Sequence, residues 1–390
     1  MTNTRLWKLT SALLLSGALL AACQPAEDEA NVDEPEEVVA PELDNGDEVD
    51  ETNEPEENGE TDEEPDDVDE VSQDLEVWFP RLENVLLEYE GDGMEGSSFT
   101  RYPQFAHDDT LQMVEMNSGT HVVTIYEYTD DHIEEIFIRP ETYFRENFMD
   151  TGLSSELEGF YYILQLPIEE GHSWENPNGT TSEITDVGLE MDTPVGTVEA
   201  IEVTTIHEDG INTYYYGENI GLIETRSHFG ENENDFEVIS QLVGYHEDQP
   251  EEFPVTIYTL DEQALGLDAI PVTMELNTND PARITLAELM KAEAPESDYT
   301  PMITEGVDIN FMYLREDGVV HADFSVELVD EMNAGAGIEN MILLGIINTI
   351  GGYYNVQEVE LTVDGGPYES GHIIVQPGET LQVDHSIVNE

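Results

Sequence analysis

The sequence predicts an α+β protein: an N-terminal antiparallel β-rich domain, built as a meander or an open half-barrel, followed by a compact α/β sandwich. Two observations favour this class. Short alternating segments separated by turn residues fill residues 77–247, as antiparallel strands do. Residues 253–390 instead mix strand-like segments with two helix-like segments. This mixture predicts helices packed on one sheet.

In the β-rich domain, alternation of apolar and polar residues between turn signals marks the strands. The turn signals include Asn-Pro-Asn-Gly at 176–179 and Glu-Asp-Gly at 208–210, both typical of loops. The helical signal is weak, and residues 141–148 are the best helix candidate. The expected strands are residues 86–89, 121–128, 133–138, 197–205, 212–216 and 236–243.

The second domain has clearer helix signals. Asp280 is a good N-cap and Pro281 fits the first helical position, which predicts a helix through Met290. Residues 338–350 are apolar on most sides, so this helix is expected to be largely buried. The expected strands are 255–259, 272–276, 307–314, 319–326 and 356–363, with a hairpin turn at 315–318. In 319–326, period-2 alternation separates Val320, Ala322, Phe324 and Val326 from His321, Asp323 and Ser325.

The N-terminus is typical of a bacterial lipoprotein signal peptide. Arg5 and Lys8 precede a short apolar run at 9–20, and Leu-Ala-Ala-Cys at 20–23 has the small residues of a lipobox. The run is too short to span a bilayer comfortably. Cys23 is the only cysteine, so we expect cleavage after residues 1–22 and lipidation of Cys23. An ordinary secretory signal with a chance cysteine is the alternative. Acyl chains would anchor the protein to the outer face of the cytoplasmic membrane.

A disordered acidic linker is expected at residues 23–76. Residues 24–76 hold 26 of the 90 Asp and Glu residues and no Lys or Arg, so they cannot bury enough apolar surface to fold. The rest of the chain is acidic too, and the net charge is −80. Such a surface repels itself unless salt screens it, which indicates a halophilic, salt-adapted host. Use of the charge to bind cations or basic partners is the alternative.

This charge disfavours nucleic acid and anionic lipid headgroups as partners. No phosphate-binding glycine motif, zinc-ligand spacing or calcium loop is found in the sequence, so no cofactor, metal or catalytic residue is expected. Ser325, His321 and Asp323 suggest a triad. However, successive members on one strand face lie about 7 Å apart, too far for a direct Ser–His hydrogen bond.

The C-terminal residues resemble a known family. Asp323-Phe324-Ser325, the helix end with Asn348-Thr349, and the turn Asp364-Gly365 occur in the order found in the GerMN (sporulation and spore germination) domain of bacterial lipoproteins. The helix with Leu-Ala-Glu-Leu-Met at 286–290 adds to this resemblance, which spans about 255–375. The family's usual Gly-Pro after the first helix is Ala-Pro-Glu at 294–296 here.

The resemblance implies a non-enzymatic, extracytoplasmic module that contacts envelope proteins, peptidoglycan or further copies of itself, in sporulation, germination or another envelope process. The interaction candidates are the motif residues Asp323, Phe324, Ser325, Asn348, Thr349, Asp364 and Gly365. The alternative is a ligand-binding lipoprotein whose β-rich domain holds a lipid or glycan. A pocket among Trp78, Tyr126, Tyr162 and Trp174 would favour that alternative; a solid core there would oppose it.

Overall fold

Twelve antiparallel strands form one continuous sheet in the first half of the computed structural model, which describes residues 71–92, 98–151, 161–207, 210–229, 236–291 and 301–389. The predicted signal peptide, Cys23 and nearly all of the predicted linker lie outside the described residues. The strands are β1 (Val85–Asp92), β2 (Phe99–Ala106), β3 (Thr110–Asn117), β4 (His121–Tyr128), β5 (His132–Pro140), β6 (Tyr161–Gln165), β7 (Ser173–Glu175), β8 (Thr181–Thr193), β9 (Gly196–His207), β10 (Gly210–Gly217), β11 (Gly221–Phe229) and β12 (Phe236–Glu247).

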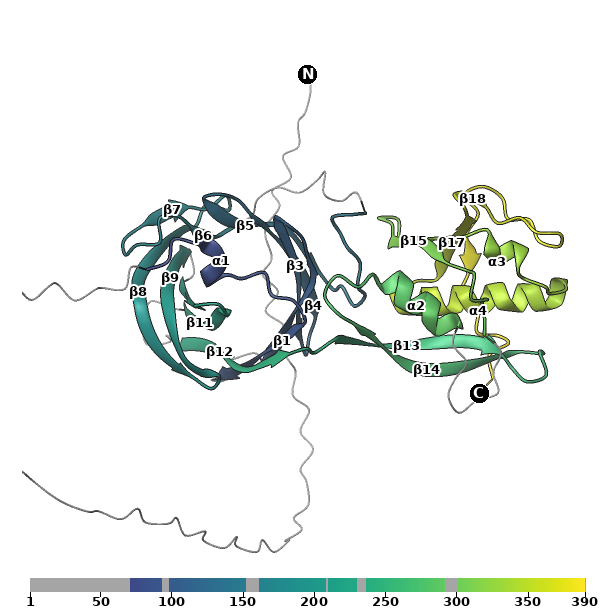
Figure 1. Cartoon of the computed structure of the whole chain (residues 1–390), viewed down its shortest axis with the longest axis horizontal. Coiled ribbons are helices and arrows are strands. Elements are labelled where there is room, and N and C mark those ends of the chain that lie inside the picture. The colour runs from purple at the N-terminus through teal and green to yellow at the C-terminus, as the bar shows by residue number, and fades with distance from the viewer. Residues whose placement is uncertain are drawn as a thin grey trace, which may run out of the picture. The chain divides into compact units, whose positions relative to one another are not determined.

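The sheet consists of two meanders joined through β1 and β12. Its order is β6-β5-β4-β3-β2-β1-β12-β11-β10-β9-β8-β7, so β6 and β7 are the two ends. These ends meet: the Tyr162 N–H donates to Asn176 Oδ1 at 3.0 Å, and the Tyr161 hydroxyl lies 2.6 Å from Thr205 Oγ1. The sheet is therefore a nearly closed ring (Figure 1), which agrees with the predicted antiparallel β-rich class.

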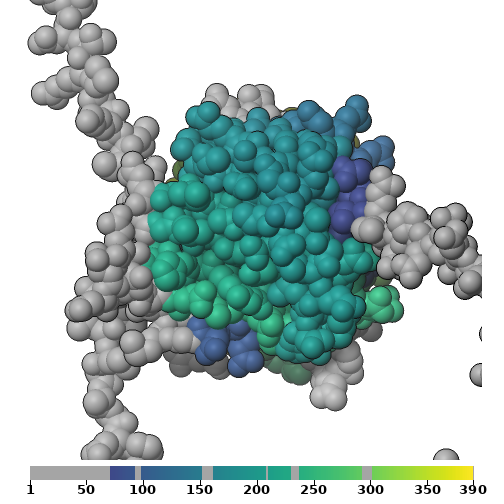
Figure 2. Space-filling model, turned by 90° about the vertical axis from the view of Figure 1, so that its left-hand side faces the viewer, coloured from purple at the N-terminus to yellow at the C-terminus, as the bar shows by residue number. Residues whose placement is uncertain are grey.

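A short helix fills the inside of this ring. Helix α1 (Leu75–Trp78) lies within the circle of strands (Figure 1), and the Trp78 side chain is 1% exposed. The Trp78 indole N–H donates to Ser72 O at 3.0 Å, which satisfies its polar atom. Tyr126 and Trp174 are buried in the same hydrophobic cluster, so these rings fill a core. Figure 2 shows the outer face of the later strands of the ring, whose side chains form one closely packed surface.

The second half of the described chain has three layers (Figure 1). A two-stranded sheet of β13 (Glu251–Leu260) and β14 (Leu267–Leu276) forms one layer. The helices α2 (Ala282–Lys291) and α4 (Ala336–Tyr354) form the second, with the short α3 (Glu327–Asp330) nearby. The third layer is the sheet of β15 (Ile309–Leu314), β16 (Val320–Phe324), β17 (Glu358–Val363), β18 (Gly366–Pro367) and β19 (Leu381–Gln382). The sequence predicts its helices and main strands, but not that β13 and β14 form a separate sheet.

Two local predictions are wrong. Residues 141–148 are not helical, because the Tyr353 hydroxyl takes the place of helical partners: it accepts from Arg145 N at 2.8 Å and donates to Arg145 O at 3.1 Å. The predicted strand at 319–326 ends at Phe324, because the Ser325 N–H turns to donate to Asp308 O at 2.9 Å and α3 begins directly afterwards.

A buried charge network joins the ring to the second half of the chain. The Arg145 side chain is fully buried, and its guanidinium lies 3.3 Å from Glu251 Oε2. It also donates to Gln104 O at 2.5 Å and Asn277 O at 2.6 Å, while Gln104 Nε2 donates to Glu251 Oε1 at 3.0 Å. Residues 67–390 accordingly form one unit by their contacts. None of the helices in the described ranges is long and apolar enough to cross a bilayer.

Helix α4 approaches β13 closely at a glycine. A Cβ on Gly345 would lie 2.6 Å from Tyr258 O and 2.2 Å from the Met302 side chain, whereas a Cβ on Gly352 of the same helix meets nothing within 4 Å. Gly345→Ala is therefore expected to lower the free energy of unfolding by about 1–3 kcal/mol through overpacking. Gly352→Ala should raise it by up to about 1 kcal/mol through helix propensity. Urea denaturation of both variants checks this; equal shifts would contradict the close approach.

Candidate functional site

Asp323 holds the turn between β17 and β18 against β16. Its carboxylate is 2% exposed. Oδ1 accepts from the Thr362 hydroxyl at 2.5 Å and from Gly365 N–H at 2.8 Å, and Oδ2 accepts from Asn310 Nδ2 at 2.8 Å. The turn has a positive φ of 44° at Asp364 and of 75° at Gly365, and glycine adopts the second of these without strain;. The Asp-Phe-Ser and Val-Asp-Gly motifs therefore meet in one hydrogen-bonded unit.

The motif Asn348-Thr349, which the sequence places at a helix end, lies inside α4, because the helix continues to Tyr354. It holds two other segments in place. Asn348 forms a pair of hydrogen bonds with the main chain of Asp384, at 2.8 and 2.9 Å. Thr349 Oγ1 accepts from Tyr258 N–H on β13 at 3.1 Å. Phe324 is fully buried in the hydrophobic core. Every motif residue thus has a partner within its own part of the fold, and its use in contacts with another molecule stays a prediction.

His321, Asp323 and Ser325 are hydrogen-bonded to other residues rather than to one another. His321 contacts the Tyr313 hydroxyl at 3.2 Å and Thr362 Oγ1 at 3.0 Å. Ser325 Oγ accepts from Asp308 N–H at 3.0 Å. The geometry therefore does not assemble a nucleophile with its base. Among the described residues, no group of three or more His, Cys, Asp or Glu side chains is placed to hold a metal ion.

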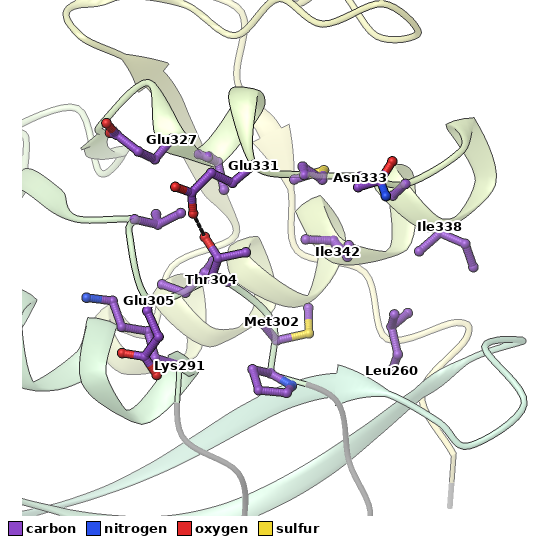
Figure 3. Close-up of a pocket in the computed structure, with 16 residues that line it drawn as sticks. Leu260, Lys291, Met302, Thr304, Glu305, Glu327, Glu331, Asn333, Ile338 and Ile342 are labelled. Atoms are coloured by element: carbon purple, nitrogen blue, oxygen red, sulfur yellow. Dashed lines mark hydrogen bonds between the residues drawn. The ribbon is translucent and has the colours of Figure 1, made fainter.

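An open pocket of about 520 Å³ lies beside α4 (Figure 3) and is called here the α4 pocket. In Figure 3 its wall is formed by Leu260, Met302, Ile338 and Ile342, which come from β13, the segment after residue 300, and the first turns of α4. Pockets of this size, with mostly apolar walls and a few polar groups, are typical of binding sites. The α4 pocket is therefore the candidate site of the second half.

Carboxylates border the α4 pocket. Glu305, Glu327 and Glu331 line its edge, and Thr304 donates a hydrogen bond to Glu331 (Figure 3). The one cation on the lining, Lys291, is already paired with Glu288 at 2.9 Å and Asp308 at 3.5 Å. Although burial opposes it, the hydrogen bond and charge of Glu288 raise the pKa of Lys291, so it stays charged and bound. The edge has a negative potential that suits a basic ligand.

The sequence does not reveal this pocket. The apolar pattern at 338–350 predicts a buried helix, and most of α4 is buried, but Ile338 and Ile342 are only partly covered. Their spacing of four residues places them on one side of α4. This spacing is the one available signal; the other walls come from residues distant in the chain. The four aromatic residues considered for a β-domain ligand do not line the pockets described here.

The fold is that of an α+β protein with a nearly closed antiparallel sheet and a helix-and-sheet domain. Residues 256–369 match the family model Germane, described as sporulation and spore germination. This part of the chain is therefore a GerMN domain, as its motifs predict. No curated protein matches the chain.

Solved structures show weaker likenesses. The tandem GerMN domains of the sporulation protein GerM from Bacillus subtilis match with 21% identity over 35% of this chain and 48% of that one, at a TM-score of 0.28. The first of those domains matches with 17% identity over 33% of this chain and 96% of that one, at 0.24. A protein described as a candidate lipoprotein from Clostridium perfringens matches with 16% identity over 34% and 87%, at 0.22.

Proposed function

We propose that the protein is a non-catalytic lipoprotein, anchored through Cys23 to the outer face of the cytoplasmic membrane. Its GerMN domain binds an apolar, basic segment of another envelope protein. The family match to sporulation and spore germination supports an envelope process of that kind. The signal sequence supports the location. The long acidic linker would let the folded part reach partners away from the membrane.

The observation that carries the docking role is the α4 pocket with its acidic edge. Its walls offer buried area to an aliphatic side chain, worth about 1.5–3 kcal/mol when fully covered. Glu305, Glu327 and Glu331 would receive a neighbouring Lys or Arg. Peptidoglycan, which lacks such apolar side chains, fits this pocket less well than a protein segment does. Self-association is disfavoured by the same charge argument, because a second copy is equally acidic.

A peptide experiment tests this role. A labelled synthetic peptide with two leucines flanked by lysines should bind the chain in fluorescence anisotropy, and Ile338→Glu should weaken binding by at least about tenfold. Residue 338 lies in the first turn of α4, where an acid favours the helix, so the variant should still fold. Ile374→Glu is the matched control, because Ile374 is 63% exposed and lies outside the pocket lining.

The dependence of peptide binding on salt separates the charge contribution to the affinity from the apolar contribution. Molar salt screens the lysine–glutamate attraction but leaves the apolar contact, so affinity should fall without disappearing. Equal binding by Ile338→Glu and Ile374→Glu, or tighter binding of a peptide with glutamates in place of lysines, would overturn the docking role.

A further inference from the structure

A second cleft, of about 610 Å³, lies where the ring meets the GerMN domain, and is called here the junction cleft. Residues from β2, the 141–151 segment, the start of α2, β15 and the end of α4 line it. Its volume is within the range of small-molecule sites. It is separate from the α4 pocket, with which it shares no lining residue.

Two arginines and a histidine line the junction cleft. The whole chain has only 10 Lys and Arg against 90 Asp and Glu, yet Arg145, Arg283 and His107 line this one cleft. The carboxylates on its lining are only Glu146 and Asp150. Asp150 is engaged, because it accepts from Asn147 Nδ2 at 2.8 Å. The cleft is thus far less negative than the chain as a whole.

The guanidinium of Arg283 has N–H donors that no described residue accepts. Its NH1 donates to Ile309 O at 2.8 Å, and within the described ranges it forms no ion pair despite the abundance of carboxylates. A guanidinium presents a planar fork of five N–H donors that matches a carboxylate in two parallel hydrogen bonds. Arg283 therefore has the chemistry to bind an anionic group that enters the cleft.

The floor of the cleft holds unsatisfied polar atoms. Glu146 is 5% exposed; its Oε2 accepts from Leu314 N–H at 3.0 Å, but its buried Oε1 has no hydrogen-bond partner. The buried Nε of Arg145 also lacks one. Burial raises the pKa of Glu146 to about 7, so at neutral pH the floor repels an anion less than an ordinary carboxylate would. Buried polar atoms without partners are costly and uncommon, and both of these atoms belong to residues of the cleft lining.

One wall is aromatic. Phe311 is 36% exposed and lies 6.0 Å, centroid to centroid, from Tyr313, and both rings line the cleft. Exposed aromatic faces pair with the C–H faces of sugar rings, whereas a simple inorganic anion has no use for them. The amides of Asn147 and Asn279 also line the cleft. A guanidinium beside aromatic rings and amide side chains is complementary to a sugar that carries an acid group.

We propose that the junction cleft binds a sugar bearing a carboxylate, with Arg283 pairing the carboxylate and Phe311 contacting the sugar ring. In the envelope this chemistry occurs in muramic acid whose stem peptide has been removed, which frees its lactyl carboxylate, and in the uronic acids of secreted polysaccharides. The proposal is independent of the docking role of the α4 pocket.

Ligand-observed NMR titrations of the whole chain test the proposal with three probes: N-acetylmuramic acid, glucuronic acid and N-acetylglucosamine. N-acetylglucosamine differs from N-acetylmuramic acid by lacking the carboxylate-bearing lactyl group. We expect at least about tenfold tighter binding of N-acetylmuramic acid than of N-acetylglucosamine, which corresponds to one charge-assisted pair. Binding of N-acetylmuramic acid alone identifies cell-wall glycan without its stem peptide as the source, and equal binding of glucuronic acid identifies acidic sugars in general.

Substitutions test the binding role proposed for each residue. Arg283→Gln should remove the preference for the acidic sugar, and Phe311→Ala should weaken both N-acetylated sugars about threefold to tenfold. Arg226→Gln is the matched control, since it makes the same charge change on β11, outside the cleft lining. Circular dichroism melting confirms that each variant is folded. Absence of binding at millimolar concentration, equal affinity for N-acetylglucosamine, or equal losses in Arg226→Gln and Arg283→Gln would overturn the proposal.

Discussion

Arg145→Met is expected to lower the free energy of unfolding by about 3–5 kcal/mol, the largest effect of any single substitution considered. The substitution leaves the Glu251 carboxylate, whose side chain is 4% exposed, without its cation. Removal of one member of a buried pair costs this much because the remaining charge is either uncompensated or must be neutralised by a proton. Burial already raises the pKa of Glu251 to about 7, although Arg145 opposes that rise. The carbonyl oxygens of Gln104 and Asn277 lose their donor as well.

A double-mutant cycle measures the pair itself. Glu251→Gln removes the charge while keeping a side chain that Gln104 can contact, so Arg145→Met combined with Glu251→Gln should be less destabilised than the sum of the two single variants. Chemical denaturation at fixed high salt provides the free energies. If the two losses simply add, the Arg145–Glu251 contact does not carry the energy assigned to it.

Asp323→Ala is expected to lower the free energy of unfolding by about 2–3 kcal/mol, because it leaves the buried Thr362 hydroxyl and the Gly365 N–H without their acceptor;. Asp330→Ala is the matched control. Asp330 is exposed at the end of α3, so its replacement should change stability by less than about 0.5 kcal/mol. The same denaturation assay compares the two. A shift for Asp323→Ala no larger than that for Asp330→Ala would show that the motif does not hold the turn.

The sequence predicts the features that depend on the local alternation of apolar and polar residues. Alternation along 319–326 correctly places Val320, Ala322 and Phe324 in the core, since the period of a strand is fixed. The same alternation assigns Asp323 to the polar face but cannot show that it is buried. Its acceptors are filled by Asn310, Thr362 and Gly365, and that arrangement exists only after β16 and β17 pair.

Contacts between segments that are distant in the sequence cannot be predicted from hydrophobic periodicity. Val85 pairs with Glu247 in the contact between β1 and β12, and no periodicity specifies a partner so far along the chain. Residues 141–148 have helical composition, yet tertiary hydrogen bonds to Tyr353 override it. Both clefts likewise combine residues from distant segments, so the sequence could suggest the GerMN domain through its motifs but not its surfaces.

The most direct test of the central claim, that the GerMN domain docks a protein partner through the α4 pocket, is site-specific photocrosslinking in the host envelope. Ile338 of the full chain is replaced with p-benzoylphenylalanine, and the same replacement at Ile374 serves as the control. We predict crosslinks from position 338 to an apolar segment of another envelope protein that contains Lys or Arg, identified by mass spectrometry and absent at 374. Crosslinks that are equally abundant at both positions, or that map only to acidic segments, would contradict the claim.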